Sequence, residues 1–394
     1  MAWLAANDIV KLPTAPVATE WNILLAAVSS DSRSAQLQGV ALSDKSVNWD
    51  FLLRLADQHG VTSLLYQSLE PLNGLVPAAI LASLRQAYER NIHKSLFLTR
   101  ELICILDCLS ELGLEVIPYK GVVLSELYYG DIALRQSGDM DLFVRKQDVG
   151  RIKRAVGDLG YTPRLPIPAD AEQDYIASGY ECTFDSPAGK NLLELQWALQ
   201  PRFYAVDFDI QGLFERSRNV TVAGRVMKTP SPEDLLLILS VHAAKHVWGR
   251  LIWLCDIAQI LKRENLNWDW IRSQARHLGI EQILHITLVL ANQLLKATIP
   301  PTLATAIRED KSAQMFAKQV AVSIASGVTY EDEKLSYFWL MMRLRERRTD
   351  RLRFLARLTF TPGPGEWEAV RLPRALFPLY RLVRLARLAS RLVR

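Results

Sequence analysis

Residues 135–144, with the sequence RQSGDMDLFV, contain two aspartates, Asp139 and Asp141, separated by one apolar residue and followed by an apolar run. Such a run predicts a β-strand, and because side chains alternate across a strand, both carboxylates are expected on one face. Mg²⁺ prefers oxygen ligands and is usually held by one or two carboxylates together with substrate phosphates. The stretch therefore predicts a divalent-metal platform for phosphoryl or nucleotidyl transfer. The alternative interpretation is a turn at Gly138, with Asp141 as an exposed strand residue.

The segment before this strand has the pattern of a phosphate-binding turn. Residues 115–121 predict a short strand that ends at Lys120 and Gly121, and residues 122–129 continue with helical periodicity. Gly121 would let the backbone approach phosphate oxygens, the helix start would offer free N–H groups, and Lys120 would add a positive charge. We therefore expect Lys120 and Gly121 to bind phosphate.

A third carboxylate is expected to join the aspartates from a later strand. Residues 191–199, NLLELQWAL, follow a turn-like segment and predict a strand that pairs with residues 181–184. The alternation places Glu194 and Gln196 on the face opposite the neighbouring leucines, so Glu194 can meet the aspartate pair. Three acids around two metal ions are the expected arrangement for an in-line displacement.

At these residues the chain resembles the uncharacterised nucleotidyltransferases of bacteria, a branch of the polymerase-β-like nucleotidyltransferase superfamily. The resemblance implies an α+β fold, with a polymerase-β-like nucleotidyltransferase core built on a mixed sheet and flanked by N-terminal and C-terminal helical lobes. It also implies metal on Asp139, Asp141 and Glu194. The segments that carry it are residues 119–121, Leu124, Tyr128, Arg135, 138–144, 193–197 and 242–256, and it runs from about Trp49 to the end.

Two positions depart from the pattern of these relatives. Val122 follows Gly121 where a second Gly or a Ser is usual, and the insert before the aspartates is longer, so the grip on a triphosphate is expected to differ. Gln196 stands where many relatives have His, so a role of that His in proton transfer or metal contact is not carried over.

The remaining pattern divides the chain into four parts. Residues 1–114 predict an N-terminal helical lobe with a loop at 30–42, residues 115–230 the nucleotidyltransferase α/β core, residues 231–342 a helical domain, and residues 343–394 a tail. Ser231 and Pro232, followed by two acids, predict a helix start at the second boundary, between residues 230 and 231.

That helix carries His242 and His246 at a spacing of four, so both side chains lie on one face. Zinc binding is one interpretation, but position 243 is Ala and the glutamate of the metalloprotease motif is absent. Buried histidines with polar neighbours are the second interpretation. The third, which the resemblance favours, is a cleft contact to nucleotide or acceptor. Its residues are His242, Lys245, His246, Arg250 and Asp256.

Composition is that of an ordinary globular protein, with 394 residues, 49% hydrophobic and 23% charged. The first residues have no basic region and no apolar core of a secretory signal, and no uncharged run approaches a membrane span, so a cytoplasmic location is expected. The four cysteines form no Cys-x-x-Cys pair, and we expect buried thiols.

The tail differs in charge from the rest of the chain. Residues 343–394 contain fourteen arginines, no lysine and four acidic residues, a balance of +10, whereas the whole chain carries +5. From Arg381 onward arginines alternate with leucines at helical spacing, which predicts a basic amphipathic helix. Three interpretations remain open: the leucines pack on the protein, the helix docks on an anionic membrane surface, or it binds nucleic acid.

Together these patterns predict a Mg²⁺-dependent nucleotidyltransferase, with Mn²⁺ as the alternative ion. It would move NMP from an NTP, with ATP expected, to an unidentified acceptor such as a small molecule, a peptide, a protein or a glycan precursor. Asp139, Asp141 and Glu194 would be catalytic, and Lys120, Gly121 and Arg135 would hold phosphates. The alternatives are a catalytically silent nucleotide-binding or interaction protein, and a membrane-surface adaptor acting through the arginine-rich tail.

Overall fold

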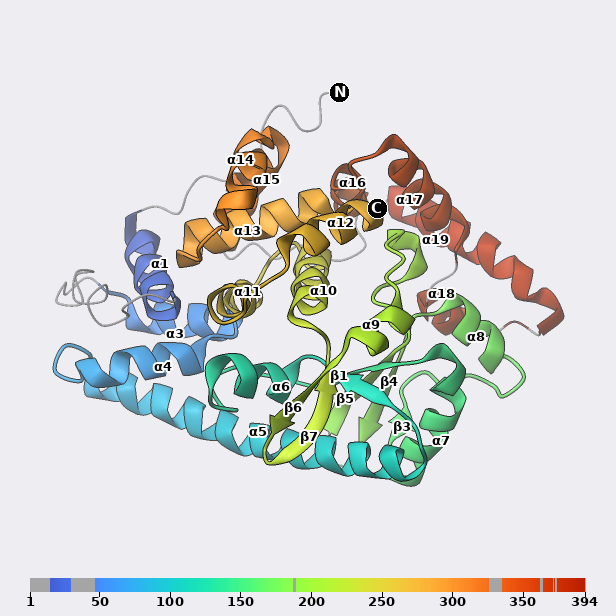
Figure 1. Ribbon diagram of the computed structural model, residues 1–394, viewed down its shortest axis with the longest axis horizontal. Helices are drawn as coiled ribbons and strands as arrows, with labels where there is room; N and C mark the ends of the chain where they lie inside the picture. The colour runs from blue at the N-terminus through green and yellow to red at the C-terminus, as the bar shows by residue number, and fades with distance from the viewer. Residues whose placement is uncertain are drawn as a thin grey trace.

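A five-stranded mixed sheet lies at the centre of the fold, with helices on both sides (Figure 1). The computed structural model describes residues 15–29, 47–186, 189–325, 335–361, 364–370, 372 and 374–393. The strand order is β1-β2-β5-β4-β3, with β2 parallel to β5 and the other neighbours antiparallel. The expected α+β class with a mixed sheet is confirmed. The strands are β1 (Val116–Pro118), β2 (Met140–Val144), β3 (Thr162–Pro163), β4 (Glu181–Ser186), β5 (Gly189–Gln196) and the separate hairpin β6 (Arg218–Val222) and β7 (Arg225–Thr229).

The two faces of the sheet belong to two different cores. Met140, Leu142 and Val144 of β2 face a core that also contains Leu193 and Leu195 of β5 and the second half of α5. The alternate positions face the other way, where Phe143 joins a larger core made mainly of helices. Strand alternation therefore turns Asp141 and Glu194 away from the first core and toward the helices on the opposite side of the sheet.

The N-terminal helices and the helices after the sheet share that larger core. The segments expected as separate helical lobes thus pack on one another, while the predicted boundaries at 114, 230 and 342 stay predictions. α5 is 34 residues long and runs beneath both the N-terminal helices and the sheet (Figure 1). The helices up to the sheet are α1 (Ala15–Val28), α3 (Trp49–Gln58), α4 (Thr62–Leu69), η1 (Glu70–Leu72) and α5 (Ala78–Glu111).

Short helices connect the strands. The expected helix after Gly121 is present as α6 followed by a π-helical turn. α7 follows β2, and Gly160 lies beyond its end at a φ of +89°. These elements are α6 (Gly121–Leu124), η2 (Ser125–Tyr129), η3 (Lys146–Asp148), α7 (Val149–Asp158), α8 (Glu172–Ser178), η4 (Arg202–Tyr204) and α9 (Ile210–Arg216).

α10 begins where the sequence predicts it. Ser231 caps the helix by accepting a hydrogen bond from the Asp234 N–H, and Pro232 occupies the first turn. Within the described residues no helix is long and apolar enough to cross a membrane. The helices that follow the sheet are α10 (Pro232–Lys245), α11 (Leu251–Arg263), α12 (Trp268–Leu278), α13 (Glu281–Leu295), α14 (Pro301–Glu309), α15 (Lys311–Ala325) and α16 (Leu335–Arg343).

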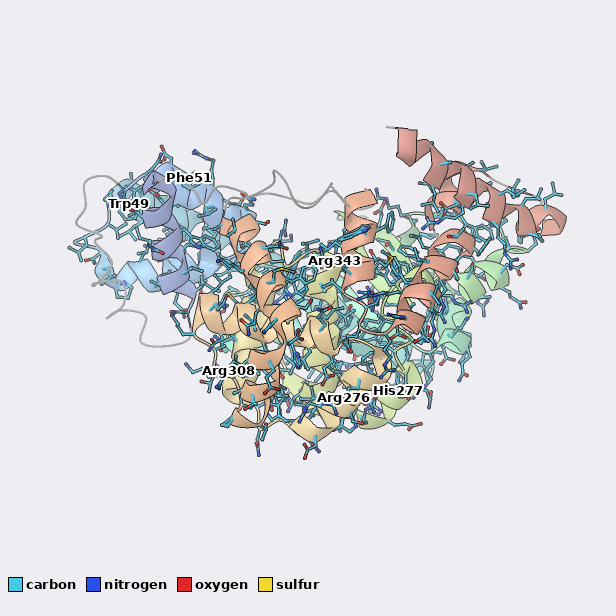
Figure 2. All side chains as sticks on the ribbon, turned by 90° about the horizontal axis from the view of Figure 1, so that it is seen from above. Trp49, Phe51, Arg276, His277, Arg308 and Arg343 are labelled. Carbon is cyan, nitrogen blue, oxygen red and sulfur yellow. The ribbon has the colours of Figure 1, made fainter. Side chains whose placement is uncertain are left out.

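The C-terminal helices lie at the end of the molecule opposite α1 and α3 in both views (Figures 1 and 2). They are α17 (Arg348–Phe360), α18 (Pro364–Ala369), η5 (Arg374–Leu379) and α19 (Tyr380–Val393). α19 is the predicted amphipathic helix, but its inner face differs from a simple leucine stripe. Arg384 is buried against Glu366, whereas Leu382 is 59% exposed. An ion pair therefore takes the place of an apolar contact on the inner face.

Two further expectations concern the cysteines and the loop at residues 30–42. Cys182 and Cys255 are buried, but Cys104 is exposed and Cys108 is half-buried, because α5 turns these two positions away from the centre of its core. The expectation of four buried thiols was therefore wrong for Cys104 and Cys108. The loop expected at residues 30–42 lies outside the described residues.

Candidate active site

Asp141 and Glu194 lie side by side on the two parallel strands at the centre of the sheet. Their Cα atoms are register partners in the β2–β5 pair, and both side chains face the helical side. Asp141 is buried and Glu194 is half-buried. The third carboxylate, Asp139, lies one residue before β2 rather than inside it. The sequence pattern thus anticipated that Glu194 lies beside the aspartates. It began the strand too early, because it included Asp139.

Gly121 touches the backbone of Asp139. It has a φ of +59°, and a Cβ at this position would lie 3.2 Å from the Asp139 carbonyl oxygen. A side chain would therefore be strained in conformation and crowded in space. Gly121, Lys120, Asp139 and Asp141 line one small hollow with room for about one water molecule, roughly 10 Å³. The predicted phosphate turn and the aspartates are thus brought together.

Lys120 forms an ion pair with Asp141. Its Nζ lies 2.9 Å from Asp141 Oδ1, and both side chains are largely buried. Burial lowers the pKa of the Lys120 ammonium, but the charge of Asp141 outweighs this effect and raises the pKa overall. The ammonium therefore stays charged and partly neutralises the carboxylates.

Gln196 links the carboxylates to Tyr119. Its Nε2 donates to Glu194 Oε2 at 3.0 Å and lies 3.5 Å from Asp141 Oδ1, while its Oε1 accepts from the Tyr119 hydroxyl at 2.7 Å. The side-chain amide of Gln196 thus acts as a donor and as an acceptor at the same time. Because the amide lacks a titratable proton at neutral pH, Gln196 orients Glu194 without acting as an acid or a base.

Asp139, Asp141 and Glu194 together offer more negative charge than the single positive charge of Lys120 neutralises. Burial, followed by the charge of Asp141, raises the pKa of Glu194 to about 8. Burial and the same neighbour raise the pKa of Asp139 to about 6. Like charges held together in a site of low polarity disfavour ionisation, which is the cause of both shifts. The site therefore has the electrostatic character of a cation-binding site.

Arg135 is held in a buried ion pair that sequence reasoning did not anticipate. Its Nε lies 2.9 Å and its Nη2 2.9 Å from the two carboxylate oxygens of Asp256, while Nη1 donates to Ser137 Oγ. The Tyr129 hydroxyl donates to the same carboxylate at 2.8 Å. The guanidinium is therefore paired with Asp256 in this structure, and the expected roles of Arg135 as a phosphate contact and of Asp256 as an acceptor contact stay predictions. The pair joins the loop before β2 to α11.

The C-terminal end of α10 approaches the carboxylates. His242 and His246 have ring centroids 5.0 Å apart, and both pack on Trp253. Burial, then the charge of Lys120, lowers the pKa of His242, and burial, then Lys245, lowers the pKa of His246 to about 3. Both imidazoles are therefore neutral at physiological pH.

The turn after α10 has an unusual backbone. Val247 and Trp248 have φ values of +51° and +50°, a region that branched and bulky residues rarely adopt. Trp248 is buried and its Nε1 donates to Thr287 Oγ1 at 2.9 Å, which holds the turn in place. Arg250, the last of the predicted acceptor contacts on this turn, is exposed.

One further carboxylate lies at the site that the sequence pattern did not single out. Glu181 on β4 is the register partner of Gln196 and accepts a hydrogen bond from the Tyr180 hydroxyl. Burial raises the pKa of Glu181, and the charge of Lys245 opposes the shift. Lys245 Nζ also lies 5.5 Å from the centre of the Tyr180 ring. The sequence could have identified Glu181, because the expected pairing of residues 181–184 with the next strand puts it on the same face as Glu194.

The donor set fits a hard divalent cation in its chemistry, but two of its carboxylate oxygens already bind side chains of the protein. Among the residues that the structure describes, no group of three or more His, Cys, Asp or Glu side chains is gathered to hold a metal ion. Lys120 contacts Asp141 Oδ1 and Gln196 contacts Glu194 Oε2. A cation bound by Asp139, Asp141 and Glu194 would therefore share these carboxylates with Lys120 and Gln196 or displace the two side chains. The raised pKa values of Asp139 and Glu194 show negative charge that such a cation would neutralise.

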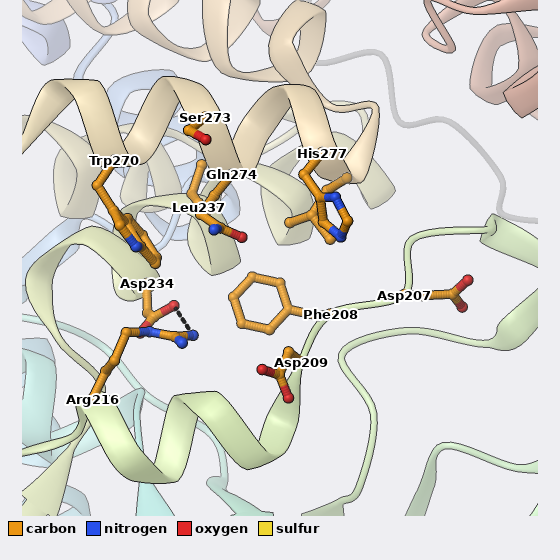
Figure 3. A pocket seen from close by; sticks show the side chains of 11 residues that line it. Asp207, Phe208, Asp209, Arg216, Asp234, Leu237, Trp270, Ser273, Gln274 and His277 are labelled. Atoms are coloured by element: carbon orange, nitrogen blue, oxygen red, sulfur yellow. Dashed lines mark hydrogen bonds and ion pairs between the residues drawn. The ribbon is translucent and has the colours of Figure 1, made fainter.

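A larger cavity of about 330 Å³ lies elsewhere, between α9, α10 and α12 (Figure 3). Phe208 and Trp270 flank it, and Arg216 forms an ion pair with Asp234 on its wall. Its charged groups are used within the fold, because Asp207 pairs with Arg357 and Asp209 caps α9. Size alone would select this cavity, but the converging carboxylates favour the smaller site on the sheet.

Comparison with known proteins identifies a family for this chain. The sequence profile of a family described as uncharacterised nucleotidyltransferases matches residues 45–296, a segment that contains the whole carboxylate site and ends before the C-terminal helices. A search of curated proteins finds no match. A crystal structure of an antigenic nucleotidyltransferase-like protein from Paracoccidioides brasiliensis is similar at 15% identity and a TM-score of 0.30, over 55% of this chain and 91% of that chain. Because the family profile covers more than half of the chain, the protein belongs to this nucleotidyltransferase family, and its fold is a nucleotidyltransferase-like α+β fold with helical extensions.

Proposed function

We propose that the protein is a Mg²⁺-dependent nucleotidyltransferase that moves NMP from an NTP to an acceptor and releases pyrophosphate. The observation that supports this most directly is the register partnership of Asp141 and Glu194, with Asp139 and the Lys120–Gly121 turn beside them. Mn²⁺ is the alternative ion, and ATP is the expected nucleotide. A cytoplasmic location stays a prediction.

The reaction proposed is an in-line displacement at the α-phosphorus. An acceptor oxygen forms a bond to that phosphorus, the bond to the bridging oxygen of pyrophosphate breaks, and the acceptor proton passes to a base. A bound divalent ion would supply neutralisation of the phosphate charge. Glu194 is our candidate base, because burial and the charge of Asp141 raise its pKa to about 8, near physiological pH.

Lys120 has a double role in this proposal. In the nucleotide-free protein its ammonium neutralises Asp141 at 2.9 Å. When a triphosphate enters, the ammonium is released to the phosphate oxygens, and Asp141 becomes available as a ligand. Gly121 keeps the backbone of the turn close to Asp139, so the turn that would bind the phosphates lies next to the proposed metal ligands.

The acceptor is proposed to bind beside the end of α10. Lys245, His242 and His246 lie there, and Arg250 extends the positive charge to the surface. Arg135 and Asp256 are proposed to position the loop before β2 rather than to contact substrate, because they bind one another. A small molecule, a peptide, a protein or a glycan precursor fits the proposal equally.

The test is calorimetric titration of each NTP with Mg²⁺ into wild type and Asp139→Asn/Asp141→Asn, after circular dichroism shows both to be folded. We expect micromolar binding of one NTP to wild type and loss of that binding in the variant. The matched control is Asp57→Asn/Asp158→Asn, which removes the same charge from exposed positions and should bind like wild type. Equal binding by all three proteins would overturn the assignment of the site.

A catalytically silent nucleotide-binding or interaction protein is the second candidate. The specific observation in its favour is that Lys120 and Gln196 already occupy oxygens of Asp141 and Glu194. Pyrophosphate release with a library of candidate acceptors discriminates the two functions. Nucleotide binding without release for any acceptor class would support the silent protein.

A further inference from the structure

The C-terminal helices present an unusual concentration of apolar side chains to solvent. Among the described residues, fourteen large apolar side chains are exposed, and seven of them lie between positions 352 and 382. Leu352 is 67% exposed and Leu382 59%. Isolated exposed leucines are ordinary, but seven exposed apolar side chains within one short segment point to an interaction site.

On α17 the exposed apolar residues share one face with arginine. Arg348, Leu352 and Leu355 follow one another at spacings of four and three, so they form one stripe along the helix, and all three are exposed. Phe354, on the opposite side, is fully buried. The stripe is therefore the outer face of a helix whose inner face is already packed.

α19 repeats this arrangement next to α17. Tyr380 and Arg384 form its inner face, and Arg384 Nε donates to the Leu358 carbonyl of α17 at 3.0 Å, so the two helices lie side by side. Arg384 and Arg387 both bind the buried carboxylate of Glu366, which fixes the orientation of α19. Leu382 then faces outward, next to the exposed Arg381.

We propose that this C-terminal face, formed by α17, η5 and α19, docks on a membrane surface that contains anionic lipid. The segment 343–394 carries +10 while the rest of the chain is negative, and Arg348, Arg351 and Arg381 bring exposed positive charge to α17 and α19, which suits an anionic surface. Helices of this kind lie in the interface plane, with leucines at the acyl boundary and arginines at the headgroups. The phosphates of a nucleic acid would pair with the arginines, but they offer no apolar surface for the exposed leucines.

The test is flotation of the full-length protein with vesicles of phosphatidylcholine containing about one third phosphatidylserine. Wild type should bind these vesicles, bind pure phosphatidylcholine at least about 10-fold more weakly, and dissociate as NaCl rises from about 0.1 M to about 0.5 M. Leu352→Glu/Leu382→Glu should lower the partition coefficient at least about 10-fold.

The matched control is Leu75→Glu/Leu112→Glu, two leucines that are 47% and 50% exposed far from this face in the sequence. It adds the same charge and should change the partition coefficient less than about 2-fold. Failure of wild type to float, or equal loss in both variants, would overturn the proposal. A dimer in solution that only Leu352→Glu/Leu382→Glu dissociates, without vesicle binding, would assign the face to a second copy. Binding of duplex DNA without vesicle binding would also overturn it.

Discussion

Asp141 and Glu194 are Cα partners on two parallel strands, although 53 positions of sequence separate their numbers. Parallel pairing places the two carboxylates on one face, and burial keeps water from separating their charges. The consequence is a site whose protonation is linked to its stability. That linkage and the contacts around it can be tested without knowing the acceptor.

The stability of the metal-free protein should fall as the pH rises, and Glu194 should be one cause. Its folded pKa of about 8 lies above the ordinary value of 4.5, so the folded protein holds this proton more tightly than the unfolded chain. The stabilisation is complete below about pH 4.5 and is lost as the pH rises through about 8. In EDTA at about pH 9, Glu194→Gln should exceed wild type by about 1 kcal/mol or more in free energy of unfolding. Urea denaturation measures this, with the exposed Glu111→Gln as control, and an advantage as large near pH 4 would contradict it.

Removal of the Lys120 ammonium should destabilise the metal-free protein strongly. Lys120→Met leaves Asp141 as a buried carboxylate without its ion-pair partner, and such losses cost about 3–5 kcal/mol. Mg²⁺ should recover part of this loss in the variant. Thermal and urea unfolding with and without MgCl₂ measure both effects. Lys318→Met, at an exposed position, should stay within about 0.5 kcal/mol of wild type.

The Arg135–Asp256 pair should be a structural unit. Arg135→Met and Asp256→Asn are each expected to cost about 3–5 kcal/mol, because each leaves a buried charge without its partner. The double variant should cost clearly less than the sum of the two, which a double-mutant cycle in urea measures. If Arg135→Met instead leaves stability unchanged and abolishes nucleotide binding, the arginine is a phosphate contact after all.

Substitution of Gln196 should show whether the hydrogen bonds of its amide contribute to the stability of the protein. Gln196→Leu leaves the buried Tyr119 hydroxyl without its acceptor and should cost about 1–3 kcal/mol. Gln196→His should cost less, since one ring nitrogen can accept from Tyr119 while the other donates to Glu194. Chemical denaturation of the three proteins gives the order. A leucine variant as stable as wild type would show that the network contributes nothing to folding.

Local patterns predicted much of the candidate site. The alternation around Asp141 and Glu194, the glycine turn at Gly121 and the cap at Ser231 each depend on a few neighbouring residues, and these features were expected from the sequence. Strand alternation is enough to decide which face a side chain occupies. It does not decide where a strand starts, which is why Asp139 was expected inside β2.

Contacts between distant segments were not predictable in the same way. Arg135 meets Asp256 across 121 positions and Tyr119 meets Gln196 across 77, and no local pattern marks such partners. The inner face of α19 is a similar case, because the repeat of arginine and leucine does not say which arginine finds a buried carboxylate. Arg384 became the inner residue because Glu366 lies beneath it.

The ion pair of Lys120 with Asp141 also gives the site a tethered counter-ion. A site that supplies its own cation can fold with its buried carboxylate neutralised before any metal binds. It also resists stray divalent ions, which must compete with an ammonium that cannot diffuse away. A nucleotide that arrives with its own metal brings both a new partner for the ammonium and a replacement for it. Under the proposed function, the site would therefore be loaded by the metal–nucleotide complex rather than by a free ion.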